Sequence, residues 1–458
     1  MEQLLAELDG IALTVDTDAV ARKSRDFYWY SPVLKAALSG YVGDVVATPA
    51  SEAELLRVVS ACYRHDVPLT VRGAGTGNYG QCMPLRGGVI LEMTAMDRVR
   101  SLDPHHVRVQ AGHKLAALEE LCRSRVGSEL RLFPSTWRTA TVGGFIAGGS
   151  SGIGAVRWGL LRDRGNVRAA RVVTMEAEPR ILELRGREVH KVNHGYGTTG
   201  IITELELALA PARDWVEMAV AMPNFTSALA FAQRICDEPG IDKRLCSLIS
   251  SPIPQSSFGR LGRLVPEGMD LVLLMVCEGD TAGVEELVAG IPGAQIVHVA
   301  RPGAGATLPS LVEYSWNHTT LRALKLDPNI TYLQVLFSGP DRLGIIAESV
   351  REFGDEVPMH LEFVNFGSHI GCFGLQLLRY TSEKRLREIM YWFELRGCPV
   401  FDPHAFTLED GGMKQVDAEQ LDFKRIADPK GLLNPGKMAA WDNPAYEAHA
   451  PVQYMYSS

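Results

Sequence analysis

The sequence lacks the features that define several common classes of protein. Its 54 acidic residues outnumber its 46 lysines and arginines, so the net charge of −8 provides no basic footprint for a nucleic acid. The longest apolar runs, such as Leu271–Cys277, are too short to cross a bilayer. The first residues, MEQLLAELDG, have neither the basic start nor the apolar core of a secretory signal. We therefore expect a cytoplasmic protein with no nucleic-acid partner and no transmembrane segment.

The eight cysteines are scattered, and no two of them form a CxxC motif. This spacing disfavours a zinc ribbon, a thioredoxin-type redox pair and an iron–sulfur cluster held by cysteines. In a long chain without a secretory signal, free thiols in a reducing compartment are the better interpretation than disulfides.

At 458 residues the chain is long for a single hydrophobic core, so two domains are expected. Fifteen of the 44 glycines fall between Gly73 and Gly159. After Pro211 the pattern changes to longer helices that alternate with apolar strands. We expect a first domain at 1–212, a second at 213–407, and a C-terminal segment at 408–458 that returns to the first.

Within the first domain, residues 51–65 are expected to form a helix, because Ser51 and Glu54 have the spacing of a capping box. The other elements expected there are strands at 67–71, 89–93, 106–111, 169–175 and 181–185, a helix at 114–125, and a closing segment at 198–208.

Three motifs in or near the glycine-rich stretches invite other interpretations. The GxGxxG of Gly75, Gly77 and Gly80 suggests a Rossmann fold, but Pro84 and the glycines after it leave no room for the required helix. The run GGSSGIG, with a YxxxK at Tyr380, has the wrong position for a short-chain dehydrogenase. The GxSxG around that run lacks the strand before it and the helix after it that a hydrolase nucleophile requires.

Two glycine-rich loops remain, at 72–84 and 139–159, and neither is expected to begin a regular helix. Successive backbone N–H groups in such loops can form a nest for an anion such as a diphosphate. The pattern therefore indicates a phosphate-bearing ligand in a non-Rossmann α+β domain. Glycines that serve only to turn corners are an equally open interpretation at this point.

Five stretches in order resemble the FAD-linked oxidases of the vanillyl-alcohol oxidase type, in the branch of the glycolate oxidase flavin subunit and the D-lactate dehydrogenases. The matching stretches are Pro68–Val71 with RGAGTGNYGQCMP, Val109–Gly112, PSTWRTATVGGFIAGGSSG from Pro134, Gly197–Thr203, and DPKGLLNPGK from Asp428. The resemblance implies an α+β fold with two domains. These would be a PCMH-type FAD-binding domain of two α+β subdomains and an α+β cap domain over the flavin.

The resemblance also implies which residues hold FAD. The first loop would wrap the diphosphate, the second would line the diphosphate and flavin side, Ile202 would hold the adenine end, and the C-terminal residues would approach the isoalloxazine ring. The implied residues are Arg72, Gly73, Ala74, Gly75, Thr76, Gly77, Pro134, Ser135, Thr136, Gly143, Gly144, Gly148, Ser150, Ile202, Asn434 and Lys437. Members with covalent flavin carry histidine where this chain has Thr76, so non-covalent FAD is expected.

The implied activity is transfer of a hydride from a small organic substrate to FAD, with a base supplied by the cap. The candidate catalytic residues are His318, Glu362 and Asn365, with His360, Tyr332 and Arg379 behind them. Hydroxy-acid members also carry a metal site spelled HxGDGNxH. The corresponding stretch here, FVNFGSHIGCFGLQ, lacks its core, so no metal is expected and the substrate is left open among alcohols, hydroxy acids and amines.

The alternative function is an FAD-carrying electron-transfer or non-catalytic subunit that works with an iron–sulfur partner. A weaker alternative keeps the fold but uses it for a synthase reaction without net oxidation. The sequence leaves the electron acceptor open among oxygen, a quinone and an electron-transfer protein, and it leaves a homo-oligomer open.

Overall fold

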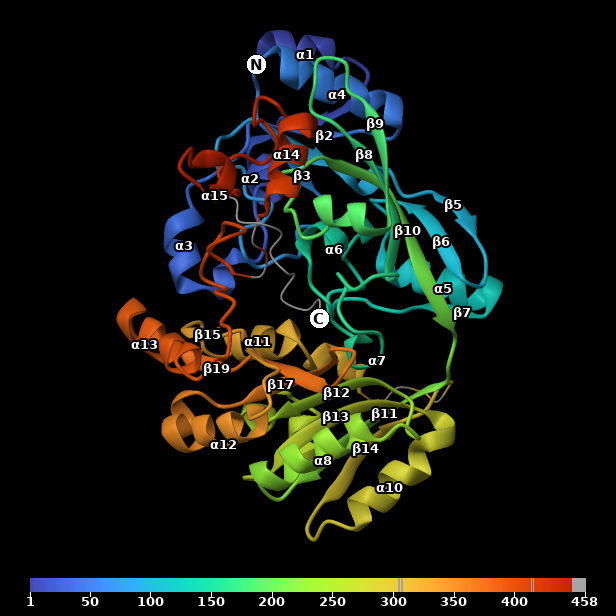
Figure 1. Cartoon of the computed structure of the whole chain (residues 1–458), viewed down its shortest axis with the longest axis vertical. Coiled ribbons are helices and arrows are strands. Elements are labelled where there is room, and N and C mark those ends of the chain that lie inside the picture. Colours follow the sequence, from blue (N-terminus) through green and yellow to red (C-terminus); the bar gives the residue numbers. More distant parts are fainter. Residues whose placement is uncertain (304, 306–307, 413, 415, 447–458) are drawn as a thin grey trace.

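The computed structural model describes residues 1–303, 305, 308–412, 414 and 416–446 (Figure 1). Two sheets form its upper part and a third forms its lower part. The first sheet has the order β1-β2-β4-β3, and its last three strands are parallel. Its strands are β1 (Ala12–Thr14), β2 (Val45–Thr48), β3 (Leu69–Arg72) and β4 (Val89–Glu92).

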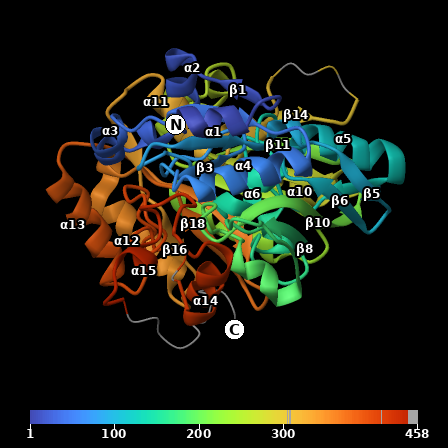
Figure 2. The ribbon, with the colours of Figure 1, turned by 90° about the horizontal axis from the view of Figure 1, so that it is seen from above.

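Helix α4 (Glu52–Arg64) covers the first sheet beside α1 (Glu2–Glu7), as Figure 2 shows. The capping residue Ser51 accepts a hydrogen bond from the backbone of Glu54 at 3.2 Å, and the Glu54 side chain accepts one from Ala50 N at 2.8 Å. The helix predicted at 51–65 is therefore confirmed, since the cap fixes its start and its apolar face packs on the sheet.

The second sheet is antiparallel, with the order β5-β6-β10-β8-β9 and β7 paired to the far end of β10. Its strands are β5 (Val99–Leu102), β6 (His106–Gln110), β7 (Ser128–Leu130), β8 (Val167–Val173), β9 (Ile181–Arg185) and β10 (Ile201–Pro211). The helices between them are α5 (Leu115–Val126), α6 (Val142–Gly148) and α7 (Ala155–Trp158).

The expectation that neither glycine-rich loop begins a helix is wrong for the second loop, which forms α6. The Thr141 hydroxyl accepts a hydrogen bond from Gly144 N at 3.3 Å, and Val142, Phe145 and Ile146 are buried. A capped first turn and burial of an apolar face outweigh the low helix propensity of glycine.

The lower part, called the cap below, is built on a seven-stranded sheet with the order β14-β11-β13-β12-β17-β18-β16. Its strands are β11 (Trp215–Met222), β12 (Lys243–Ile249), β13 (Asp270–Cys277), β14 (Gln295–Ala300), β16 (Val335–Phe337), β17 (His360–Asn365) and β18 (Ile370–Gly374). A small ribbon pairs β15 (Ile330–Tyr332) with β19 (Leu377–Arg379). The helices are α8 (Phe225–Asp237), α9 (Ile253–Ser257), α10 (Thr281–Ala289), α11 (Asn317–Leu324), α12 (Arg342–Phe353) and α13 (Glu383–Glu394).

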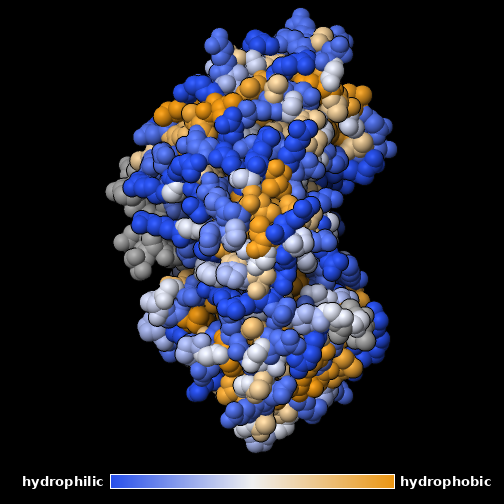
Figure 3. Space-filling view, turned by 90° about the vertical axis from the view of Figure 1, so that its right-hand side faces the viewer, coloured by the Kyte–Doolittle hydropathy of each residue, from blue (hydrophilic) through white to orange (hydrophobic). Residues whose placement is uncertain are grey.

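The C-terminal segment returns to the upper part through α14 (Ala418–Ala427) and α15 (Ala439–Asp442). Its backbone joins the open edge of the first sheet, where Leu69 N donates to Leu432 O and Asn434 N donates to Leu69 O, both at 2.9 Å. Helices α2 (Thr17–Lys23) and α3 (Pro32–Leu38) complete this region. The molecule narrows between its upper and lower parts, and apolar residues lie in separate patches on the face shown in Figure 3.

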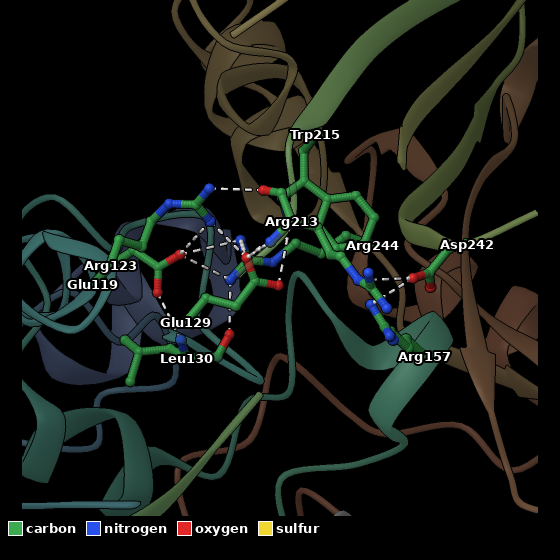
Figure 4. A network of polar contacts seen from close by, with 9 residues as sticks. All are labelled: Glu119, Arg123, Glu129, Leu130, Arg157, Arg213, Trp215, Asp242 and Arg244. Atoms are coloured by element: carbon green, nitrogen blue, oxygen red, sulfur yellow. Dashed lines mark hydrogen bonds and ion pairs between the residues drawn. The ribbon is translucent and has the colours of Figure 1, made fainter. Parts of the chain in front are cut away.

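A buried network of charges joins the two parts (Figure 4). Arg244 on β12 donates to the Glu119 carboxylate at 3.1 Å and to Leu130 O at 2.7 Å, and it lies 3.5 Å from Glu129. Glu129 also accepts from the Trp215 indole at 2.9 Å. All three ionised side chains are nearly inaccessible to solvent. The network therefore fixes the cap on the upper part at the junction of α5, β7 and β12.

Candidate flavin site

A long cavity runs between the two glycine-rich segments and the cap. Its empty volume is about 1720 Å³, open solvent included. The upper wall comes from the loop after β3, from Pro134–Thr136, from the segment around α6 and from Ile202 on β10. The lower wall is formed by five cap residues, namely Trp316, Asn317, Gln334, Phe373 and Leu375.

The loop after β3 presents a row of free backbone donors to the cavity. Within the described residues, the N–H groups of Ala74, Gly75, Thr76, Gly77 and Asn78 find no hydrogen-bond acceptor, although all five residues line the cavity. These five residues are half-buried, and successive free backbone donors that point into one cavity can form a nest for an anion. Gly75 has a φ of +67°, which a side chain would strain.

Glycines bring the two segments together behind this row. A Cβ on Gly73 would lie 2.2 Å from the Thr141 hydroxyl, and one on Gly143 would lie 2.6 Å from the Ala111 Cβ. The first amides of α6 already have partners, because Val142 N donates to His113 O and Gly143 N to Ala111 O. The free donors are nevertheless not confined to the first loop, because Ser135, Thr136, Ser150 and Ser151 line the same cavity and their N–H groups also find no acceptor in the described part of the chain.

Most of the residues predicted to hold the cofactor line this one cavity, and two of them lie behind it. The predicted residues that line it are Arg72, Gly73, Ala74, Gly75, Thr76, Gly77, Pro134, Ser135, Thr136, Gly143, Gly144, Gly148, Ser150 and Ile202. Asn434 and Lys437 are fully buried behind the first loop. The Asn434 amide donates to Gln81 O at 2.7 Å and to Tyr196 O at 2.6 Å, so it ties the C-terminal segment to that loop.

Buried charges lie beneath the first loop. Arg72 donates to the backbone oxygens of Lys23 and Arg25 at 2.8 and 2.6 Å. Burial lowers the pKa of Lys437 to about 8, and burial raises the pKa of Asp26 to about 6. The Lys437 ammonium has no hydrogen-bond partner within the described part of the chain. Arg72, Lys437 and Asp26 therefore form a compact group of buried charges beneath the first loop.

The cap contacts the first loop through Tyr332, which the sequence analysis named, and through Gln334, which it did not. Tyr79 on the first loop donates from its hydroxyl to the Gln334 side chain, and the Asn78 amide donates to the Tyr332 hydroxyl at 2.7 Å. These bonds connect the proposed diphosphate loop directly to the cap. Burial raises the pKa of Tyr79 to about 12, so its phenol stays protonated and acts as a donor.

The candidate catalytic residues do not appear among the residues that line the cavity. His318 on α11 pairs with Glu313 at 3.3 Å, and the Asn365 amide donates to Arg157 O at 3.4 Å. Glu362 and His360 are inaccessible and bonded to each other at 2.7 Å. Their roles stay predictions.

Tyr332 and Arg379, which were predicted to lie behind the catalytic candidates, differ in their burial and in their contacts. Tyr332 is buried beside the cavity wall and accepts from Asn78, whereas Arg379 is largely exposed and pairs with Asp327 at 3.3 Å. The segment EYSWNHTT, which drew attention to His318, does reach the cavity, through Trp316 and Asn317. The sequence thus pointed to the correct segment, but side-chain direction within it depends on packing.

Two further properties concern the described residues only. They contain no group of three or more side chains arranged to hold a metal ion. None of their helices combines the length and apolar character needed to cross a membrane.

Comparisons with known proteins agree with this geometry. Residues 43–183 match the FAD binding domain family. The chain is 32% identical to D-lactate dehydrogenase of Anaerostipes hadrus over 201 residues, which are 41% of each chain, so it covers less than half of that relative. It is 27% identical to glycolate oxidase subunit GlcD of Bacillus subtilis over 442 residues, 87% of this chain and 89% of that one.

Among solved structures, an alkyldihydroxyacetonephosphate synthase superposes with a TM-score of 0.73 over 95% of this chain and 86% of that one, at 18% identity. This likeness shows a shared fold. The chain is therefore an α+β flavoprotein built on a PCMH-type FAD-binding domain. Over that domain the chain is similar to the glycolate oxidase subunits and D-lactate dehydrogenases. The row of free amides in the first loop fits the FAD diphosphate.

Proposed function

We propose that this chain is an FAD-dependent oxidoreductase that transfers a hydride from a small alcohol, hydroxy acid or amine to non-covalently bound FAD. The observation that carries the proposal is the cavity itself. It has a row of free amides at one wall and uncharged and aromatic cap residues at the other. The names of the relatives, D-lactate dehydrogenase and glycolate oxidase subunit, make D-lactate and glycolate the first substrates to test.

When bound, FAD supplies a ring that accepts a hydride from a substrate carbon. The residues of this chain then have separate tasks. The loop amides bind and orient the diphosphate end, and Lys437 and Arg72 stabilise its negative charge from below. The cap residues Trp316, Phe373 and Leu375 line the cavity from the cap side and would exclude water from the bound cofactor there. His318, Glu362 and Asn365 stay candidates for the proton-transfer group.

Non-covalent attachment rests on Thr76, which stands where covalent members carry histidine and whose side chain lies 3.4 Å from that of Thr136. We also propose the division into 1–212, 213–407 and 408–458, although residues 447–458 lie outside the described part of the chain. A cytoplasmic location belongs to the same proposal.

A second candidate function is an FAD-carrying subunit that passes electrons to a partner. The Bacillus subtilis relative is a glycolate oxidase subunit, and this likeness favours the second candidate. The eight cysteines are all free and well separated in sequence, so a cluster-bearing partner would be a different chain. Reduction of a dye by the purified chain and one of these substrates separates the two functions.

The loop assignment is tested by Gly73→Ala with Gly40→Ala as the matched control. A Cβ at Gly73 would press on Thr141 and force the two segments apart, whereas a Cβ at Gly40 meets nothing within 4 Å. We expect the first variant to bind FAD at least about tenfold more weakly (~1.4 kcal/mol) in a fluorescence titration of the apoprotein. Equal affinities for both variants would refute the diphosphate assignment.

A further inference from the structure

Two adjacent residues at the end of the amide row bind the cap. Asn78 contributes the last of the five free backbone N–H groups in the first loop, and its side-chain amide donates to the Tyr332 hydroxyl at 2.7 Å. The hydroxyl of the next residue, Tyr79, donates to the Gln334 side chain. The same short stretch therefore supplies a donor for the proposed ligand and two hydrogen bonds to the cap.

The peptide unit that joins Gly77 to Asn78 is also held from its other side. Its carbonyl oxygen, that of Gly77, accepts a hydrogen bond from Phe27 N at 2.7 Å. Because the peptide unit is trans and planar, its N–H must point in the direction opposite to that bond. The direction of this free donor therefore depends on two anchors, which are Phe27 N on the carbonyl and Tyr332 on the side chain of Asn78.

Tyr332 is the fixed member of this pair. It ends β15, which pairs with β19 in the two-stranded cap ribbon, and it is inaccessible to solvent. Its ring meets that of Tyr30 edge-on with the centroids 6.4 Å apart, and its backbone oxygen lies 3.1 Å from His404 Nε2. The preceding Thr331 donates to Tyr30 O at 2.8 Å. All six residues of the cap ribbon are described and none lines the cavity, so Tyr332 can affect a ligand there only through Asn78 and other neighbours.

We propose that Tyr332 is a positioning residue for FAD, which acts through Asn78 to hold the last donor of the amide row in its ligand-binding direction. FAD binding to the row and docking of the cap ribbon on the first loop then stabilise each other, because both restrict the same residue. Such coupling is reciprocal, so the factor by which the bond raises the affinity for FAD is the factor by which FAD suppresses opening of the ribbon. The inference rests on the proposed function, since it takes the FAD diphosphate as the ligand of the row.

The test compares Tyr332→Phe, Asn78→Ala and the double variant with Tyr391→Phe. The control removes the hydroxyl of an exposed tyrosine on α13, which also lies in the cap. The Kd of FAD is measured by fluorescence titration of each apoprotein. Hydrogen exchange of the backbone amides in the cap ribbon is then followed with and without saturating FAD, because exchange reports the local opening of a segment.

In the wild type, FAD should slow hydrogen exchange of the cap ribbon about 3- to 10-fold, the range expected for one neutral hydrogen bond. Tyr332→Phe and Asn78→Ala should each abolish this slowing and raise the Kd of FAD by a similar factor, because the coupling is reciprocal. The double variant should bind FAD no more weakly than the weaker-binding single variant, since both changes remove the same bond. Tyr391→Phe should behave as the wild type does.

A cap ribbon whose exchange does not respond to FAD in the wild type, or responds equally in Tyr332→Phe, would overturn the inference. A purely structural role of Tyr332 gives the second result, because the variant then speeds exchange equally with and without FAD. If Tyr332→Phe fails to fold, Asn78→Ala tests the same bond from its half-buried side. A wild-type chain that does not bind FAD would contradict the proposed function as well, so the two failures are distinguishable.

Discussion

Replacing Arg244 with methionine should strongly destabilise the protein by breaking the network between the cap and the upper part. Arg244 is the buried cation that faces Glu119 and Glu129, and it also donates to Leu130 O. Removing one partner of a buried ion pair costs about 3–5 kcal/mol, because the charge left behind is uncompensated.

The low end of that range applies here. Glu129 keeps its ion pair with Arg123 at 2.6 Å and its bond from Trp215, and Glu119 keeps the bond from Leu130 N at 2.7 Å. We therefore expect the free energy of unfolding to fall by about 3 kcal/mol. Methionine fills most of the vacated volume, so the loss reports on charge and hydrogen bonds more than on a cavity.

Urea unfolding followed by tryptophan fluorescence measures this loss. The control is Arg234→Met, since Arg234 also lies in the cap but is exposed and pairs with Glu238 at 3.3 Å. It should cost less than about 0.5 kcal/mol. Adding Glu119→Gln and Glu129→Gln to Arg244→Met should recover part of the stability, because no buried charge then lacks a partner. If Arg244→Met were as stable as Arg234→Met, the network would contribute nothing and the reasoning would be refuted.

Three further predictions concern the buried titratable groups. Burial depresses the pKa of His404 from 6.5 to about 4. The contribution of neutral His404 to the free energy of unfolding is therefore present above pH 6.5 and is lost as the pH falls toward 4. Urea unfolding at pH 7 and pH 4.5 should show this loss, and His404→Gln should lessen it; an equal loss in the variant would contradict the assignment. Lys437→Met should raise the Kd of FAD about tenfold (~1.4 kcal/mol) in apoprotein titrations. The control Lys384→Met, which replaces an exposed lysine, should leave the Kd unchanged. Equal affinities of the two variants would show that the buried cation does not contribute to FAD binding. If His318 is the general base, His318→Ala should slow flavin reduction by ~10²–10⁴-fold in stopped flow, and an unchanged rate removes it from the candidates.

Much of the fold was predictable because its local signals are strong. The helix-capping residue Ser51 and the apolar stripe after it predicted α4. The strand predicted at 181–185 has the same bounds as β9. Helix α6 was not predicted because glycine has a low helix propensity. It forms because its apolar residues are buried in the folded protein and because the Thr141 side chain caps its first turn.

The candidate site divides in the same way. The first loop could be predicted because its glycines, its spacing and the strand before it lie together in the sequence. The wall of the cavity formed by the cap could not be predicted, because Trp316, Gln334 and Phe373 come from separate segments and meet only through the packing of the cap. The sequence also favoured Glu362 as a catalytic group, whereas in the structure its two oxygens accept from the Ser247 hydroxyl and Trp316 N and contact the His360 ring. The position of a glutamate in the sequence does not show whether its carboxylate oxygens have hydrogen-bond partners in the folded protein.

The most direct test of the account is the absorption spectrum of the purified protein, measured before and after acid precipitation. The account predicts a flavin spectrum that passes into the supernatant and is identified there as FAD. Colour retained in the pellet would contradict non-covalent binding. A colourless protein that cannot be reconstituted with FAD would contradict the central claim, because the row of amides would then serve only the structure of the loop.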